Sequence, residues 1–114
     1  MSSDFDLGTL RELRDIMDQD FDELIEAYLS DTRTRIDDVR VAVIAKDTYQ
    51  LRELAHSLKG SCSNIGAVTL AQWCQKAENM AKEGELEGVS DVVDEIQRQF
   101  AAVRSVLIQE LGAA

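Results

Sequence analysis

Residues 51–65 read LRELAHSLKGSCSNI, a run in which apolar residues recur at helical spacing. At about 100° per residue these apolar residues gather on one side of a helix. They are Leu51, Leu54, Ala55, Leu58, Cys62 and Ile65. His56, the single histidine of the chain, falls on the opposite side. The stretch therefore predicts a helix that buries one face and presents one imidazole to solvent.

The neighbours of His56 on the outer face of the helix could bind an anionic group and allow a second protein to approach closely. They are Arg52, Lys59, Gly60 and Ser63. An exposed imidazole is readily neutral near pH 7, so a ring nitrogen can act as a nucleophile. Lys59 lies on the next turn, where it can pair with an anion at the ring. Gly60 costs a helix about 1 kcal/mol relative to alanine, which indicates close approach by a second protein. The alternative is a surface histidine beside an incidental glycine.

The remaining sequence also has helical periodicity, interrupted by short breaks. Five helices are predicted, over about 9–17, 20–45, 48–65, 67–83 and 90–111. We expect Thr9 to cap the first helix with Glu12 as its capping-box partner, Asp47 to cap the third and Ser90 to cap the last. Gly66 marks a turn between the third and fourth helices.

Long amphipathic helices joined by short connections favour antiparallel neighbours. The chain has 114 residues, no proline and only 5% aromatic residues, a composition typical of a helical bundle. We therefore expect an all-α fold: an up-and-down antiparallel four-helix bundle with a short extra N-terminal helix. Residues 1–114 are expected to form a single domain around one core.

Cysteine usage and hydropathy place the chain in the cytoplasm. Cys62 and Cys74 both fall on inward helical positions, which favours two reduced, buried thiols over a disulfide. No zinc-ligand spacing surrounds them, so no metal site is expected. The N-terminus has no signal character and no apolar run is long enough to span a membrane.

The charge of the chain is strongly negative but uneven. The net charge is −10, yet residues 52–82 hold four cations against two anions, which leaves −12 on the rest. An acidic protein does not attract nucleic acid or anionic membranes, so neither is an expected partner. A local excess of cations around His56 suits a site that holds a phosphoryl group. Most of the acidic residues have a simpler interpretation, as a solvated surface.

The motif around His56 resembles the signature of a known family. Its residues are His56-Ser57-Leu58-Lys59-Gly60-Ser61, then Ile65-Gly66-Ala67, and then Leu70, Cys74 and Glu78. This pattern is similar to that of histidine-containing phosphotransfer (HPt) domains, the relay proteins of multistep two-component signalling. The resemblance covers nearly the whole chain and implies a four-helix bundle, in agreement with the periodicity. It also implies a freestanding relay protein, and Met1 together with a complete bundle favours this over a fragment of a hybrid kinase.

The resemblance implies a catalytic role for three residues. Nε2 of His56 is expected to attack the phosphorus of an aspartyl phosphate and become phosphorylated. Nδ1 then carries the proton and donates it to Glu78, at the position where the family has glutamate or glutamine. Gln75, one turn earlier, is the alternative acceptor and is otherwise expected to bind phosphate or the partner. Lys59 is expected to pair with the phosphoryl oxygens.

Other residues are expected to bind phosphate or the partner. Gly60 keeps the approach open, and Arg52 and Ser63 share its face. Lys82, one turn beyond Glu78, is a candidate at the rim. Both Lys82 and Glu78 also have a simpler interpretation, as an ordinary surface ion pair at i, i+4.

The implied function is that of a phosphocarrier and not of an enzyme. The sequence has no Gly-rich phosphate loop and no kinase signature. The implied partners are the receiver domain of a hybrid sensor histidine kinase and that of a response regulator. No cofactor is expected, because magnesium belongs to the receiver, and the protein is expected to be a monomer.

Two other classes of function remain open. One is a helical interaction module that sequesters a partner, with His56 incidental. The other is a hydrolase or metal site that uses His56, for which the sequence supplies neither an obvious nucleophile nor a second ligand.

Overall fold

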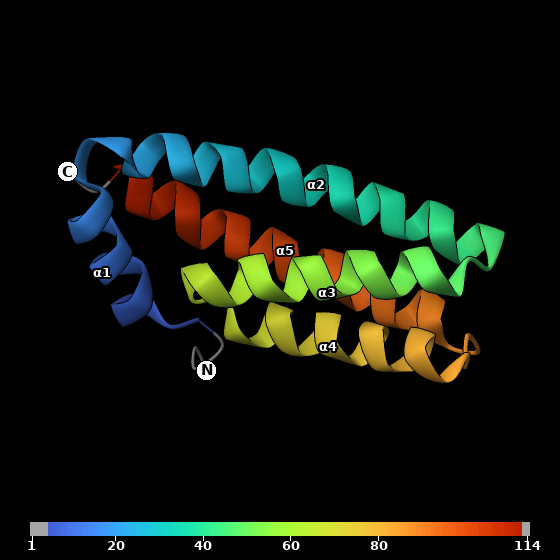
Figure 1. Cartoon of the computed structure of the whole chain (residues 1–114). Helices are drawn as coiled ribbons and strands as arrows, with labels where there is room; N and C mark the ends of the chain where they lie inside the picture. Colours follow the sequence, from blue (N-terminus) through green and yellow to red (C-terminus); the bar gives the residue numbers. More distant parts are fainter. Residues whose placement is uncertain (1–4, 113–114) are drawn as a thin grey trace.

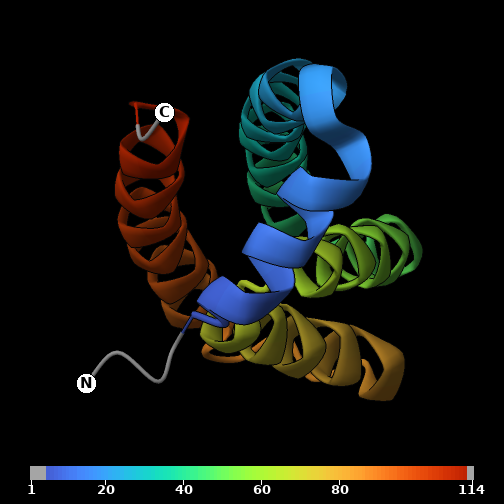
Figure 2. The ribbon, with the colours of Figure 1, turned by 90° about the vertical axis from the view of Figure 1, so that its left-hand side faces the viewer.

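The computed structural model describes residues 5–112 and contains five α-helices. Four long helices form the bundle: α2 (Phe21–Ala45), α3 (Thr48–Ile65), α4 (Val68–Glu83) and α5 (Val89–Gly112). The short helix α1 (Leu7–Met17) lies across one end of it (Figures 1 and 2) and leads into α2 through a 3₁₀ turn, Asp18–Asp20. The predicted fold class is confirmed, and α3 has the predicted bounds.

Each long helix packs against two neighbours in the order α2, α3, α4, α5, and the closest pair is α3 and α4. All inward residues predicted for α3 are buried except Leu54, which is half-buried against the core. Cys62 and Cys74 are free, buried thiols, as predicted. Cys62 Sγ lies 3.2 Å from the buried Tyr28 hydroxyl. The hydrogen bond to Cys62 and burial raise the pKa of Cys74, so that thiol stays protonated.

The structure corrects two of the predicted helix caps. Asp6, and not Thr9, caps α1: its Oδ1 accepts a hydrogen bond from Thr9 N at 3.1 Å. Thr9 and Glu12 therefore lie inside the helix and form no capping box. Ser90 also lies inside its helix, because α5 begins at Val89. Asp47 does cap α3, where Oδ1 accepts from Gln50 N at 3.0 Å.

The turn between α3 and α4 determines how these helices face each other. Gly66 closes α3 with a φ of 94°, in the left-handed region. Its carbonyl accepts a hydrogen bond of 2.8 Å from Asp6 N, which fastens the start of α1 to the turn. A Cβ on Gly66 would lie 2.5 Å from the Asp6 carbonyl oxygen. Glycine is therefore required here both by backbone conformation and by space.

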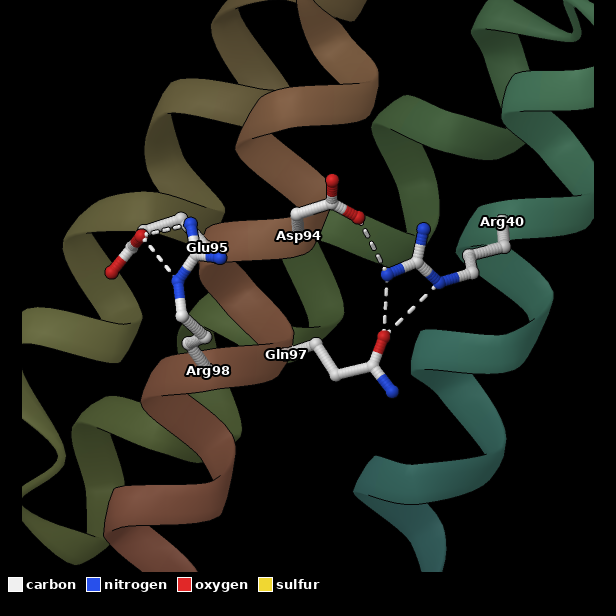
Figure 3. A network of polar contacts seen from close by, with 5 residues as sticks. All are labelled: Arg40, Asp94, Glu95, Gln97 and Arg98. Atoms are coloured by element: carbon white, nitrogen blue, oxygen red, sulfur yellow. Dashed lines mark hydrogen bonds and ion pairs between the residues drawn. The ribbon is translucent and has the colours of Figure 1, made fainter.

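Polar side chains on the outside of the bundle join α5 to α2 (Figure 3). Arg40 of α2 pairs with Asp94 at 2.9 Å, and its Nε donates to Gln97 Oε1 at 3.1 Å. One turn along α5, Arg98 pairs with Glu95 of its own helix at 2.7 Å. The contacts of Arg40 join the two helices, and such ion pairs near the surface contribute little energy individually.

Glu110 holds the N-terminal helix to the end of α5. Its carboxylate pairs with Arg14 at 2.7 Å and with Arg11 at 3.4 Å. Arg14 also lies over the Phe21 ring, 5.2 Å from its centroid. The hydrogen bond from Arg11, together with that from Arg14, holds the pKa of Glu110 below its ordinary value of 4.5, against the opposing effect of desolvation.

Acid is expected to weaken this attachment of α1. A carboxyl group with a lowered pKa stabilises the folded state above its unfolded pKa, and this contribution disappears as the pH falls through the folded pKa. Glu110→Gln should therefore lower the free energy of unfolding near pH 7 and change it much less near about pH 3. Urea unfolding of both proteins at the two pH values measures this. An equal difference in the free energy of unfolding at both pH values would show that the charge of the Glu110 carboxylate does not hold α1.

Candidate functional site

The candidate site lies on the outer faces of α3 and α4, the two helices that pack most closely. His56 projects from the middle of α3 with 65% of its side chain exposed. Its Nδ1 lies 3.0 Å from Oε2 of Glu78 on α4. Because α3 and α4 run antiparallel from a two-residue connection, residues 22 positions apart in sequence meet across the pair.

Glu78 fixes the tautomer of His56. The carboxyl group is only 14% exposed, and this desolvation raises its pKa. Hydrogen bonds and charges from Lys59 and His56 outweigh the desolvation, so the net effect lowers the pKa below 4.5. An ionised carboxylate can only accept, so the proton of a neutral imidazole must lie on Nδ1. Nε2 then keeps its lone pair, on a side chain that is mostly exposed.

Lys59 lies one turn beyond His56 and contacts the same carboxylate. Its Nζ is 3.2 Å from Glu78 Oε1, an ion pair in which hydrogen-bond alignment is poor. The better hydrogen bond of Lys59 goes to Gln75 Oε1, at 2.8 Å. Gln75 in turn donates from Nε2 to Asn79 Oδ1 at 2.9 Å. A continuous chain of polar contacts therefore runs from His56 through Glu78 and Lys59 to Gln75 and Asn79.

The predicted site residues divide into two groups. Lys59, Gln75 and Glu78 come together with His56, and it is Glu78 and not Gln75 that contacts the ring. Lys82, Arg52 and Ser63 are exposed, and none of them makes an ion pair or side-chain hydrogen bond within residues 5–112. Glu78 therefore pairs with His56 and Lys59 and not with Lys82. The sequence reasoning missed Asn79, which lies one turn beyond Gln75 on α4, a spacing that could have revealed it.

Gly60 has no packing reason to be glycine. A Cβ built on it would meet nothing within 4 Å, and the residue lies inside α3. His56, Gly60 and Asn64 form a row along α3 at intervals of four residues. Asn64 borders a hollow of about 530 Å³ between α1, α2 and α3, lined mainly by apolar side chains such as Leu13, Met17 and Leu24.

The described residues 5–112 contain no cluster of three or more side chains able to hold a metal ion. None of the helices described is long and apolar enough to cross a membrane.

An exposed imidazole with one nitrogen held by a carboxylate, on a four-helix bundle, agrees with the site that the resemblance to HPt domains implies. The Hpt domain family matches residues 23–106. The chain therefore belongs to the Hpt domain family, the relay proteins that pass phosphoryl groups in two-component signalling.

Individual relatives agree with this assignment. The chain is similar to the crystal structure of histidine-containing phosphotransfer protein B (HptB) from Pseudomonas aeruginosa PAO1, with 34% identity, 96% of each chain covered and a TM-score of 0.93. It is 27% identical over 107 residues to pseudo histidine-containing phosphotransfer protein 2 of Oryza sativa subsp. japonica, covering 91% of this chain and 71% of that protein.

A more distant structure shares the fold. Ypd1 of Saccharomyces cerevisiae, crystallised with the receiver domain of its downstream response regulator Ssk1, is 16% identical. The match covers 98% of this chain and 97% of Ypd1 with a TM-score of 0.89.

Proposed function

We propose that His56 accepts a phosphoryl group from an aspartyl phosphate on one receiver domain and passes it to the aspartate of another. The observation that carries the proposal is the contact between His56 Nδ1 and Glu78 Oε2, at 3.0 Å, on a ring that is otherwise exposed. It leaves Nε2 free to react and keeps the proton on the nitrogen that does not.

No proton leaves the site during the proposed transfer. The Nε2 lone pair forms the new N–P bond while the P–O bond to aspartate breaks, and the aspartate departs as a carboxylate. The ring keeps its Nδ1 proton and acquires positive charge, which the carboxylate of Glu78 offsets. The reverse sequence returns the phosphoryl group to a receiver. Lys59 supplies positive charge beside the phosphoryl oxygens, where such transfers need it.

The phosphoryl group is proposed to come from a receiver and not from ATP, because the sequence has no nucleotide-binding motif. The donor would be the receiver domain of a hybrid sensor kinase and the acceptor that of a response regulator. The carrier itself would need no metal, since magnesium belongs to the receiver. We also propose that it works as a monomer in the cytoplasm, where such receivers are found.

The row His56–Gly60–Asn64 and the adjoining hollow offer a docking face for the receiver. The hollow supplies apolar surface, and Gly60 lets the partner backbone approach α3. The complex of Ypd1 with a receiver domain supports a receiver as the partner of a protein with this fold.

The test is a transfer assay with the wild-type chain. Receiver domains charged with radiolabelled acetyl phosphate are mixed with the protein, and the label is tested for stability in acid and alkali. We expect acid-labile, alkali-stable label that peptide mapping places on His56. Because phospholysine has similar stability, label mapped to Lys59 would contradict the proposal. So would the absence of label from every receiver that binds the protein.

Gly60→Glu is expected to weaken docking of the receiver while leaving the fold intact. Alanine at this position would stabilise the helix by about 0.5–1 kcal/mol, and glutamate is also a good helix former. The free energy of unfolding should therefore stay the same or rise. Transfer from a charged receiver should fall at least tenfold, because a long, charged side chain now fills the approach to His56.

The measurement pairs urea unfolding with initial transfer rates, and Gly60→Ala serves as the small control. A Gly60→Glu protein that transfers at the wild-type rate would show that receivers do not approach across Gly60.

A further inference from the structure

Lys59 is held by side chains of the neighbouring helix α4. It donates a hydrogen bond to Gln75 Oε1 at 2.8 Å and forms an ion pair with Glu78 Oε1 at 3.2 Å, and both residues belong to α4. Glu78 contacts the imidazole through Nδ1, so the carboxylate with which Lys59 pairs lies on the Nδ1 side of the ring. A phosphoryl group would be attached at Nε2, on the other edge. Lys59 is thus engaged elsewhere when the histidine is unphosphorylated.

Gln75 is oriented to hold the lysine. An amide side chain can present either its oxygen or its nitrogen to a neighbour. Here the nitrogen donates to Asn79 Oδ1 at 2.9 Å, so the oxygen faces Lys59. Gln75 is half-buried, and the Lys59 side chain is only 29% exposed. Limited access to water makes this hydrogen bond to a charged group harder to replace by solvent.

We propose that Gln75 is a positioning residue that holds Lys59 in the unphosphorylated protein and thereby sets the equilibrium between phosphohistidine and phosphoaspartate. The inference rests on the proposed function of His56. In this proposal Lys59 gives up its hydrogen bond to Gln75 when it turns toward phosphoryl oxygens attached at Nε2. That bond stabilises only the unphosphorylated state, so it favours return of the phosphoryl group to the receiver.

Removing the Gln75 oxygen that accepts the hydrogen bond from Lys59 should therefore leave more of the phosphoryl group on His56. For Gln75→Leu, which keeps the bulk of the side chain and loses its oxygen, we expect a three- to tenfold shift of the equilibrium constant toward phosphohistidine. Asn79→Ala, which only frees the amide to rotate, should shift it in the same direction by less. In a Lys59→Ala background, Gln75→Leu should cause no shift, because the lysine through which it acts is absent.

The experiment measures the label on the carrier and on one receiver after the reversible transfer has reached equilibrium. This equilibrium constant does not depend on how tightly the proteins dock, so a docking defect cannot imitate the effect. Gln72→Leu, the same substitution on an exposed turn of α4, is the matched control and should leave the constant unchanged. Circular dichroism checks that every variant is folded.

The possible failures are distinguishable. A wild-type protein that takes no label would overturn the proposed function itself. A labelled wild type with an unchanged or lowered constant in Gln75→Leu would overturn the role of Gln75 alone. The same shift with and without Lys59 would show that Gln75 does not act through the lysine.

Discussion

Replacing His56 with glutamine is expected to abolish acceptance of the phosphoryl group and to leave the protein folded. His56 is the only histidine of the chain, so no other imidazole can accept the phosphoryl group. The amide nitrogen of glutamine has no comparable lone pair. The side chain is 65% exposed, so its loss should change the free energy of unfolding by no more than about 0.5 kcal/mol. Glutamine can still donate to Glu78, which preserves that contact.

The measurement combines label uptake from a charged receiver with receiver binding by titration calorimetry. We expect label to fall to background and the dissociation constant to change by less than about threefold, or under about 0.7 kcal/mol. Ser57→Ala, an exposed neighbour on the same helix, is the control and should accept label normally. Persistent label in His56→Gln would place the phosphoryl group on another residue. Loss of binding together with label would leave the chemical role of the ring unsupported.

Gly66→Ala is expected to destabilise the fold by about 2–4 kcal/mol. Alanine pays about 1–2 kcal/mol for a left-handed backbone conformation, here at a φ of 94°. The new Cβ would also lie 2.5 Å from the backbone oxygen of Asp6, so the segment that begins α1 must move. The 2.8 Å hydrogen bond from Asp6 N to Gly66 O is then strained or lost.

Gly84 provides a matched control for this prediction. It ends α4 in the same left-handed region, with a φ of 73°, but a Cβ there would meet nothing within 4 Å. Gly84→Ala should therefore cost only the conformational part, about 1–2 kcal/mol. Urea unfolding of both variants isolates the contribution of the Asp6 contact. Equal losses of stability would show that the start of α1 moves aside freely.

The fold could be predicted from the sequence because its signals are local and repeated. Helical spacing identified all five helices, and Asp47 marked the start of α3 correctly. The cap at Thr9 was wrong because another suitable start lies three residues earlier, and the cap at Ser90 was wrong because α5 begins one residue before it, at Val89. Asp6 is an equally good cap three positions before Thr9, and local sequence cannot choose between them.

The site could be predicted only in part. The exposure of His56 followed from periodicity, but the contact with Glu78 was expected only from the family resemblance. Contacts across two helices depend on their register, which the turn at Gly66 sets and which periodicity within one helix does not specify. For this reason the acceptor that Lys59 uses, Gln75, was expected in a different role, and Asn79 was not expected at all.

The polar groups of the site all lie within residues 56–79, on one helical hairpin. The hollow beside them is built largely from α1 and α2, which come earlier in the chain. With a receiver docked on the hollow as proposed, the residues that carry the chemistry and most of those that contact the receiver belong to different segments of the chain. That arrangement predicts that substitutions in α1 and α2 change which receiver binds while the hairpin stays unchanged, so the specificity of the relay could be altered by grafting these two helices.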